Sequence, residues 1–103
     1  MIGYISGPIS NDPNYKKRFG WAAKQLTDRG YAVINPADLF KVAPVEEMEY
    51  EDIMDVALVL LSKADYLIQL PGWEASKGAC IECGYARAQS MPVLALAELL
   101  TED

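Results

Sequence analysis

Residues 64–86 read ADYLIQLPGWEASKGACIECGYA, and this stretch contains the transition on which the fold assignment depends. Residues 65–70 are apolar and β-prone, which predicts a strand that Pro71-Gly72-Trp73 ends. Ser76 is a favourable helix N-cap, and the pattern after it predicts a helix over about residues 77–89. We therefore expect a strand, a loop and a helix in direct succession.

The rest of the chain repeats this alternation. Short apolar runs bounded by Gly, Pro or Asn predict strands at residues 2–6, 31–35 and 92–97. Residues 11–14 are typical of a helix N-terminus, with Asp12 as the cap and Pro13 in the first turn. The amphipathic helix that follows is expected to end at Gly30. A second long helix is expected over about residues 45–63, after a connector at 37–45, and the last residues form a short helix or fray.

This order of elements predicts β-α-β units and therefore a parallel sheet with right-handed crossovers. The expected fold class is α/β, a flavodoxin-like or Rossmann-like three-layer sandwich with four or five parallel strands. The 103 residues leave room for a single domain, 1–103. Ligands of such sheets bind beyond the carboxyl ends of the strands, which directs attention to the loops at residues 6–12, 35–38 and 70–78.

Composition excludes several classes of function. The chain has no histidine, so Ser-His-Asp triads, Cys-His pairs and histidine zinc sites are ruled out. A net charge of −6 argues against a nucleic-acid partner. The longest apolar run, residues 56–61, is too short to span a membrane, and the N-terminus lacks the pattern of a signal peptide. A cytoplasmic location is therefore expected.

Cys80 and Cys83 form a C-x-x-C pair inside the predicted helix. A redox pair is better placed at a helix N-terminus, and a structural zinc would need two further Cys or His ligands. We expect two buried cysteines that pack as small apolar residues, with no metal and no cofactor. The acidic run at residues 46–55 is interpreted as a solvated helix face, with a docking surface for a basic partner as the alternative.

Three features could carry chemistry. Glu82 borders the small-residue face of its helix, where a carboxylate is costly unless it is used or is paired with a Lys or Arg. The loop after the first strand contains Gly7, which permits a close backbone approach or a positive φ, and hydroxyls that could hold a phosphate or a sugar. Ser76 can cap a helix and contact a phosphate, and Trp73 either stacks on a base or covers the core.

Four segments in the same order, YISGPI (4–9), VINPA (33–37), residues 64–86 and PVLAL (92–96), resemble the nucleoside 2-deoxyribosyltransferase superfamily. The strongest likeness is to its small phage and bacterial DUF4406 branch, which is related to the deoxynucleoside 5′-monophosphate N-glycosidases. This resemblance implies a flavodoxin-like sheet and a homodimer or larger assembly. It also implies a retaining double displacement on a nucleoside or its 5′-monophosphate, in which a glutamate attacks C1′.

Glu82 occupies the motif position of that nucleophile, and Ser76 matches the serine that contacts the 5′-phosphate in the monophosphate hydrolases. The resemblance implies a wider set of substrate-binding residues drawn from the matching segments: Tyr4, Ser6, Gly7, Pro8, Ile9, Asn35, Pro36, Trp73, Ser76 and Gly78.

One position departs from the family pattern. The family usually has an aspartate eight residues before the aspartate of the third strand, where this chain has Ala57. In the family this aspartate assists departure of the base as a general acid, and loss of a general acid typically costs about 10²–10⁴-fold in rate. The chain is either altered at position 57, or uses Asp55 or Asp52 instead, or is a binder without turnover. Asp55 is two residues from position 57, so its side chain is turned about 200° around the helix from that position. The resemblance thus implies an N-glycosidase or deoxyribosyltransferase, with a non-catalytic nucleotide-binding module as the alternative.

Overall fold

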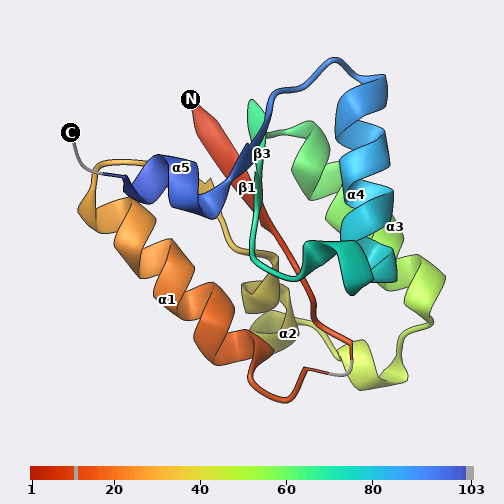
Figure 1. The fold of residues 1–103 in the computed structure, drawn as a ribbon. Helices are drawn as coiled ribbons and strands as arrows, with labels where there is room; N and C mark the ends of the chain where they lie inside the picture. Colours follow the sequence, from red (N-terminus) through yellow and green to blue (C-terminus); the bar gives the residue numbers. More distant parts are fainter. Residues whose placement is uncertain (11, 102–103) are drawn as a thin grey trace.

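The computed structural model describes residues 1–10 and 12–101 of the chain (Figure 1). Its four parallel strands are β1 (Ile2–Ser6), β2 (Ala32–Ile34), β3 (Tyr66–Gln69) and β4 (Val93–Ala95). They form one sheet in the order β2-β1-β3-β4. The predicted α/β fold class is confirmed, with four strands in the sheet of the described residues.

The described residues also form five helices and three short 3₁₀ segments. The helices are α1 (Tyr15–Asp28), α2 (Leu39–Val42), α3 (Tyr50–Ser62), α4 (Lys77–Ala88) and α5 (Leu96–Leu100), and the 3₁₀ segments of the described residues are η1 (Pro36–Asp38), η2 (Val45–Glu47) and η3 (Trp73–Ala75). None of the helices in the described part of the chain is long and apolar enough to cross a bilayer.

Several element boundaries differ from the sequence-based expectation. The helix expected from residue 45 starts at Tyr50, because Met48 and Glu49 adopt extended backbone conformations after η2. The strand expected over residues 92–97 ends at Ala95, where the Glu98 side chain accepts a hydrogen bond from the Ala95 amide and starts α5. Backbone conformation therefore sets the first boundary, and a local hydrogen bond sets the second.

The start of α1 also differs from the prediction. The helix begins at Tyr15, so Pro13 precedes it and does not occupy its first turn. Asp12 accepts a hydrogen bond from the Asn14 amide at 2.9 Å and pairs with Arg18 at 2.8 Å, and it therefore organises the turn before the helix. Asn11, which belonged to the predicted start signal, lies outside the described residues.

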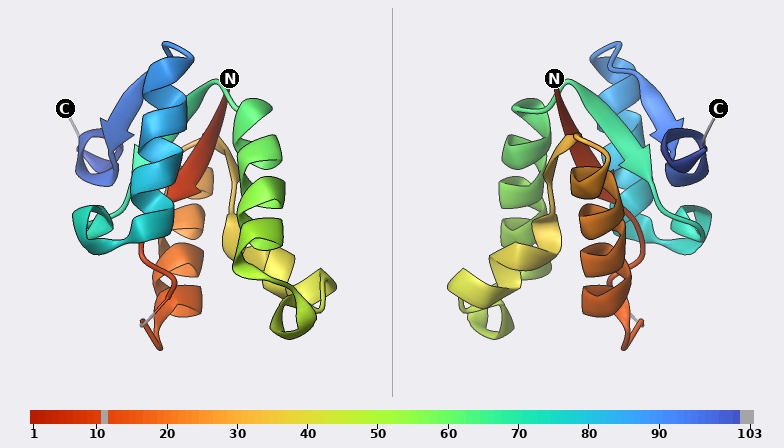
Figure 2. Two further views of the ribbon diagram at one scale, coloured as in Figure 1. Left: turned by 90° about the vertical axis from the view of Figure 1, so that its right-hand side faces the viewer. Right: turned by 90° about the vertical axis from the view of Figure 1, so that its left-hand side faces the viewer.

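The sheet is covered on both faces, as Figure 2 shows: α1 and α5 lie on one side, and α3 and α4 lie on the other. Alternate residues of the central strands supply the two cores. Ile5 and Ile68 pack toward α1, and Tyr4 and Leu67 pack toward α3 and α4. This alternation places residues 4 and 6 of β1 on the face that α4 covers.

The two cysteines have different environments. Cys83 is buried with Ala79, Glu82 and Ala86 on the inner face of α4, whereas Cys80 is exposed. The expectation of two buried cysteines is therefore wrong for Cys80. A residue that directly follows Ala79 in a helix is turned about 100° away from it, toward the solvent side.

Candidate functional site

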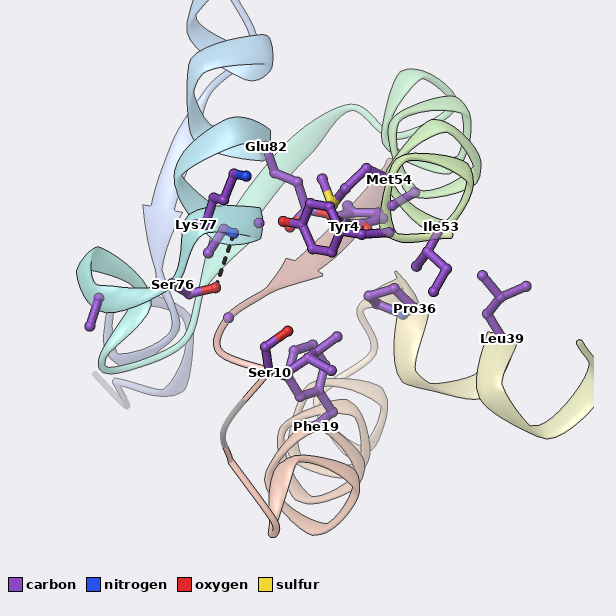
Figure 3. Close-up of a pocket in the computed structure, with 17 residues that line it drawn as sticks. Tyr4, Ser10, Phe19, Pro36, Leu39, Ile53, Met54, Ser76, Lys77 and Glu82 are labelled. Atoms are coloured by element: carbon purple, nitrogen blue, oxygen red, sulfur yellow. Dashed lines mark hydrogen bonds between the residues drawn. The ribbon is translucent and has the colours of Figure 1, made fainter. Parts of the chain in front are cut away.

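A cavity of about 440 Å³ opens at the carboxyl ends of β1 and β3 (Figure 3). The strand order changes direction at this point of the sheet. The next strand along the chain, β2, pairs with one side of β1, and β3 pairs with the other side. Parallel α/β sheets usually bind their ligands in such a crevice. The lining residues come from β1, the loop after it, α1, η1, α2, α3, the end of η3 and the first half of α4: Tyr4, Gly7, Ile9, Ser10, Phe19, Pro36, Leu39, Tyr50, Ile53, Met54, Ala57, Ala75, Ser76, Lys77, Gly78, Ala79 and Glu82.

Glu82 lies at the inner end of this cavity and is only 7% exposed. Its two carboxylate oxygens accept separate hydrogen bonds from β1: the Tyr4 hydroxyl donates to Oε2 at 2.5 Å, and the Ser6 hydroxyl donates to Oε1 at 2.7 Å. Tyr4 and Ser6 are two residues apart on one strand, so both side chains reach the same face of the sheet. The two bonds fix the orientation of the carboxylate.

The electrostatics of Glu82 follow from this burial. Burial raises the pKa of the carboxyl above its usual value, and the hydrogen bonds from Tyr4 and Ser6 act in the opposite direction. Burial, together with the charge of Glu82 and the hydrogen bond to it, raises the pKa of the Tyr4 phenol, which therefore remains a donor. No Lys or Arg of the described residues forms an ion pair with Glu82. The carboxylate is thus held by neutral donors.

Two glycines bring the backbone close to the cavity. A Cβ on Gly7 would lie 2.9 Å from Leu70 Cβ, so the loop after β1 can pass against the loop after β3 only without a side chain at this position. A Cβ on Gly78 would lie 3.3 Å from the Tyr50 hydroxyl and 3.4 Å from Met54 Sδ. Gly78 therefore keeps the space open between the first turns of α3 and α4.

The outer end of the cavity is formed at the start of α4. Ser76 caps this helix, because its hydroxyl accepts a hydrogen bond from the Ala79 amide at 3.2 Å. Lys77 follows directly, and its Nζ lies 5.2 Å from the centroid of the Tyr50 ring. A helix N-terminus with a hydroxyl and an ammonium group beside it can hold an anionic group of a ligand.

One face of α3 forms the opposite wall. Tyr50, Ile53, Met54 and Ala57 line the cavity at the spacing of a single helix face. Ala57 is 8% exposed and presents only a methyl group. Asp55 and Asp52 are exposed and do not line the cavity, so the structure does not bring either alternative aspartate into this site.

Most of the residues expected from the sequence meet at this cavity. Tyr4, Gly7, Ile9, Pro36, Ala57, Ser76, Gly78 and Glu82 line it, and Ser6 contacts Glu82. Others lie apart from the lining. Asn35 caps η1 by accepting a hydrogen bond from the Ala37 amide, and Trp73 packs against the core cluster that includes Cys83 and Ala86. Pro8 lies beside Gly72, where an added Cβ would be 3.6 Å from Pro8 Cγ. Trp73 therefore covers core residues in this structure.

Sequence reasoning missed several lining residues. Tyr50, Ile53 and Met54 share the α3 face with Ala57, and helical spacing from position 57 would have identified them. Phe19 and Leu39 were not found because they reach the cavity through the packing of α1 and α2, which no local pattern reports. Ser10 and Lys77 lie within the loops at residues 6–12 and 70–78 to which the strand ends directed attention, but neither was named as a binding residue.

The family assignment comes from comparison with known proteins. The family model described as a domain of unknown function (DUF4406) matches residues 1–95. No curated protein matches the chain. Among solved structures, the 2-deoxyribosyltransferase from the psychrotolerant bacterium Bacillus psychrosaccharolyticus is similar, with a TM-score of 0.71 and 21% identity over 92% of this chain and 71% of that chain. The chain therefore belongs to the DUF4406 family, and it has the fold of a 2-deoxyribosyltransferase.

Proposed function

We propose that this chain breaks the N-glycosidic bond of a nucleoside or a nucleoside 5′-monophosphate through a covalent glycosyl intermediate on Glu82. The observation that carries the proposal is the carboxylate of Glu82, which is buried at the inner end of the cavity and oriented by two hydroxyl groups. Nucleophilic catalysis by a carboxylate splits one difficult substitution into two easier ones. The chemistry requires neither a metal nor a cofactor.

In the first step, one oxygen of Glu82 attacks C1′ of the sugar and the base departs. In the second step, water or a second base attacks C1′ and regenerates the carboxylate, with net retention at C1′. Tyr4 and Ser6 keep the carboxylate turned into the cavity, so little reorganisation is needed at the moment of attack. Their hydroxyls also stabilise the carboxylate when it is released in the second step.

The substrate is placed by the chemistry of the two ends of the cavity. We propose that the sugar lies against Glu82 and that a 5′-phosphate lies at the start of α4, near Ser76 and Lys77. The base then points toward the apolar wall of Pro36, Leu39 and Ile53, as the arrangement of these side chains in Figure 3 allows. We also propose a homodimer or larger assembly, which light scattering would test.

Release of free base, measured by chromatography with a panel of nucleosides and 5′-monophosphates, tests this function. Glu82→Gln should abolish release, while Glu74→Gln, which changes an exposed carboxylate near α4, should leave it unchanged. Ala57→Asp should raise the rate if position 57 lacks a general acid, whereas Val59→Asp, on the exposed side of α3, should not. Base release that survives Glu82→Gln would refute the proposal.

A nucleotide-binding module without turnover is the second candidate, and Ala57 is the observation that favours it. A ligand at a hundredfold excess over Kd would stabilise the fold by about 2.7 kcal/mol. Stabilisation by nucleotides, with no base released by either the wild-type chain or Ala57→Asp, would support binding alone. Base release would refute it.

A further inference from the structure

The α3 wall of the cavity provides no acid for a departing base. A neutral nucleobase carries developing negative charge as it leaves, and enzymes usually protonate it with a positioned side chain. The α3 residues that line the cavity are Tyr50, Ile53, Met54 and Ala57, none of which has a carboxyl group. A neutral leaving group would therefore have to depart without a proton from this helix.

Several other polar groups of the site are poorly suited to this task. The hydroxyls of Tyr4 and Ser6 already donate to Glu82. Burial, with a further contribution from the charge of Glu82, raises the pKa of the Tyr50 phenol, which therefore holds its proton more tightly. The Lys77 ammonium lies over the Tyr50 ring, and Lys77 is the first residue of α4, five residues before Glu82.

The buried carboxylate also lacks a cation. Glu82 has neutral donors on both oxygens and no ion pair within the described residues. An ionised group removed from water without a counter-charge is costly, and a ligand that carries a positive charge beside it relieves that cost.

From these three observations we propose that the site acts on N-glycosides whose base is already cationic, namely nucleotides of an N7-alkylated purine or of an N-ribosylated pyridine. The proposal rests on the function proposed for Glu82 and specifies its substrate class. Such a base needs no proton to leave. An alanine at position 57 then suits this leaving group, because no proton donor is needed there. The site remains competent without an aspartate at that position.

The reaction balances without a general acid in its first step. A Glu82 oxygen forms a bond to C1′, the bond from C1′ to the base nitrogen breaks, and its electron pair neutralises the positive charge of the ring. The base leaves as a neutral molecule. Water then attacks C1′, the bond from C1′ to Glu82 breaks, the carboxylate is restored, and one proton is released to solvent.

The test compares base release from nucleotides that carry a cationic base and from nucleotides that carry a neutral base. We would measure kcat/KM for base release from N7-methylguanosine and guanosine 5′-monophosphates, each as the ribo and 2′-deoxyribo form, and from nicotinamide mononucleotide. Because N7-methylation weakens the bond even without enzyme, the informative quantity is how the charged-to-neutral ratio differs between the wild-type chain and Ala57→Asp. The wild-type ratio should be larger by about 10²–10⁴-fold, the usual contribution of a general acid.

Two further measurements keep the test decisive if Ala57→Asp fails to fold. In the wild-type chain alone, log kcat/KM should fall steeply as the basicity of the leaving nitrogen rises across a series of bases. Lys77→Gln should leave the charged-to-neutral ratio unchanged, whereas a rise in that ratio, from slower release of neutral bases, would identify Lys77 as the acid and overturn the inference.

The possible failures are distinguishable. If neutral bases leave as fast as cationic ones in a reaction that Glu82→Gln abolishes, the substrate class is wrong while the proposed function stands. If no base is released from any of these nucleotides, the proposed function fails and the inference fails with it.

Discussion

Replacing Tyr4 with Phe removes a single hydroxyl from the inner end of the cavity. Tyr4 is 0% exposed, and its hydroxyl donates to Glu82 Oε2 at 2.5 Å. A hydrogen bond to a charged group contributes about 1.5–3 kcal/mol to stability, and losing it leaves a buried oxygen without its donor. For a domain of about this size each kcal/mol corresponds to about 4–8 °C in Tm, so Tyr4→Phe should lower Tm by about 6–24 °C near neutral pH.

The effect should depend on pH. Burial already raises the pKa of Glu82 above its ordinary value of 4.5, and the bond from Tyr4 opposes that rise, so Tyr4→Phe should raise the pKa further. A carboxyl whose pKa is higher in the folded state stabilises the fold below the unfolded value, and this contribution is lost as pH rises through the folded pKa. The variant should therefore lose more stability at high pH than at pH 4. The acidic limb of its pH–rate profile should shift to higher pH.

The assay combines thermal unfolding at several pH values with the pH profile of base release. Tyr66→Phe is the matched control, because it removes a hydroxyl from a buried tyrosine on β3 that forms no hydrogen bond with the described residues. The reasoning would be refuted if the two variants lost the same stability and the rate profile of Tyr4→Phe coincided with that of the wild-type chain.

Three other changes give separate tests. Glu82→Gln removes a buried charge, so urea unfolding should show a more stable protein near neutral pH, with a gain that shrinks as pH falls toward 4.5; a constant gain would contradict this. Gly78→Val places a side chain within 3.4 Å of the Tyr50 hydroxyl and should weaken nucleotide binding in calorimetry; unchanged affinity would argue against this cavity as the binding site. Gly3→Ala brings a Cβ to 2.7 Å from an isoleucine on β3 and should cost about 1–3 kcal/mol in chemical unfolding, whereas Gly20→Ala, with open space around it, should not destabilise α1; equal effects would contradict the packing argument.

The fold was predictable because its signals are local and repeated. The first three strands are short apolar runs followed within two residues by Gly or Pro, and the alternation with amphipathic helices leaves few topologies open. The limits of α3 were not predictable in the same way. An apolar pattern continues back to Val45, but the extended backbone at Met48 and Glu49 separates η2 from the helix, and no residue type at these positions announces that break.

The candidate site was predictable at Glu82 and less so around it. Helical spacing placed this carboxylate at the edge of the small-residue face, and the structure shows that its partners are hydroxyls of β1 and not a Lys or Arg. Period-two alternation along β1 would have indicated both partners. Phe19 and Leu39 reach the cavity only through tertiary packing, so their contribution could not be derived from the chain alone.

Covalent trapping tests the central claim most directly. A 2′-deoxy-2′-fluoro-arabinonucleoside 5′-monophosphate should form its glycosyl intermediate and hydrolyse it slowly, because the fluorine opposes the positive charge that develops at C1′ in both steps. Mass spectrometry of the digested protein should find the fluorinated sugar phosphate on the peptide that contains Glu82, and Glu82→Gln should show none. Release of base without any adduct, or an adduct on a different residue, would contradict the assignment of Glu82 as the nucleophile.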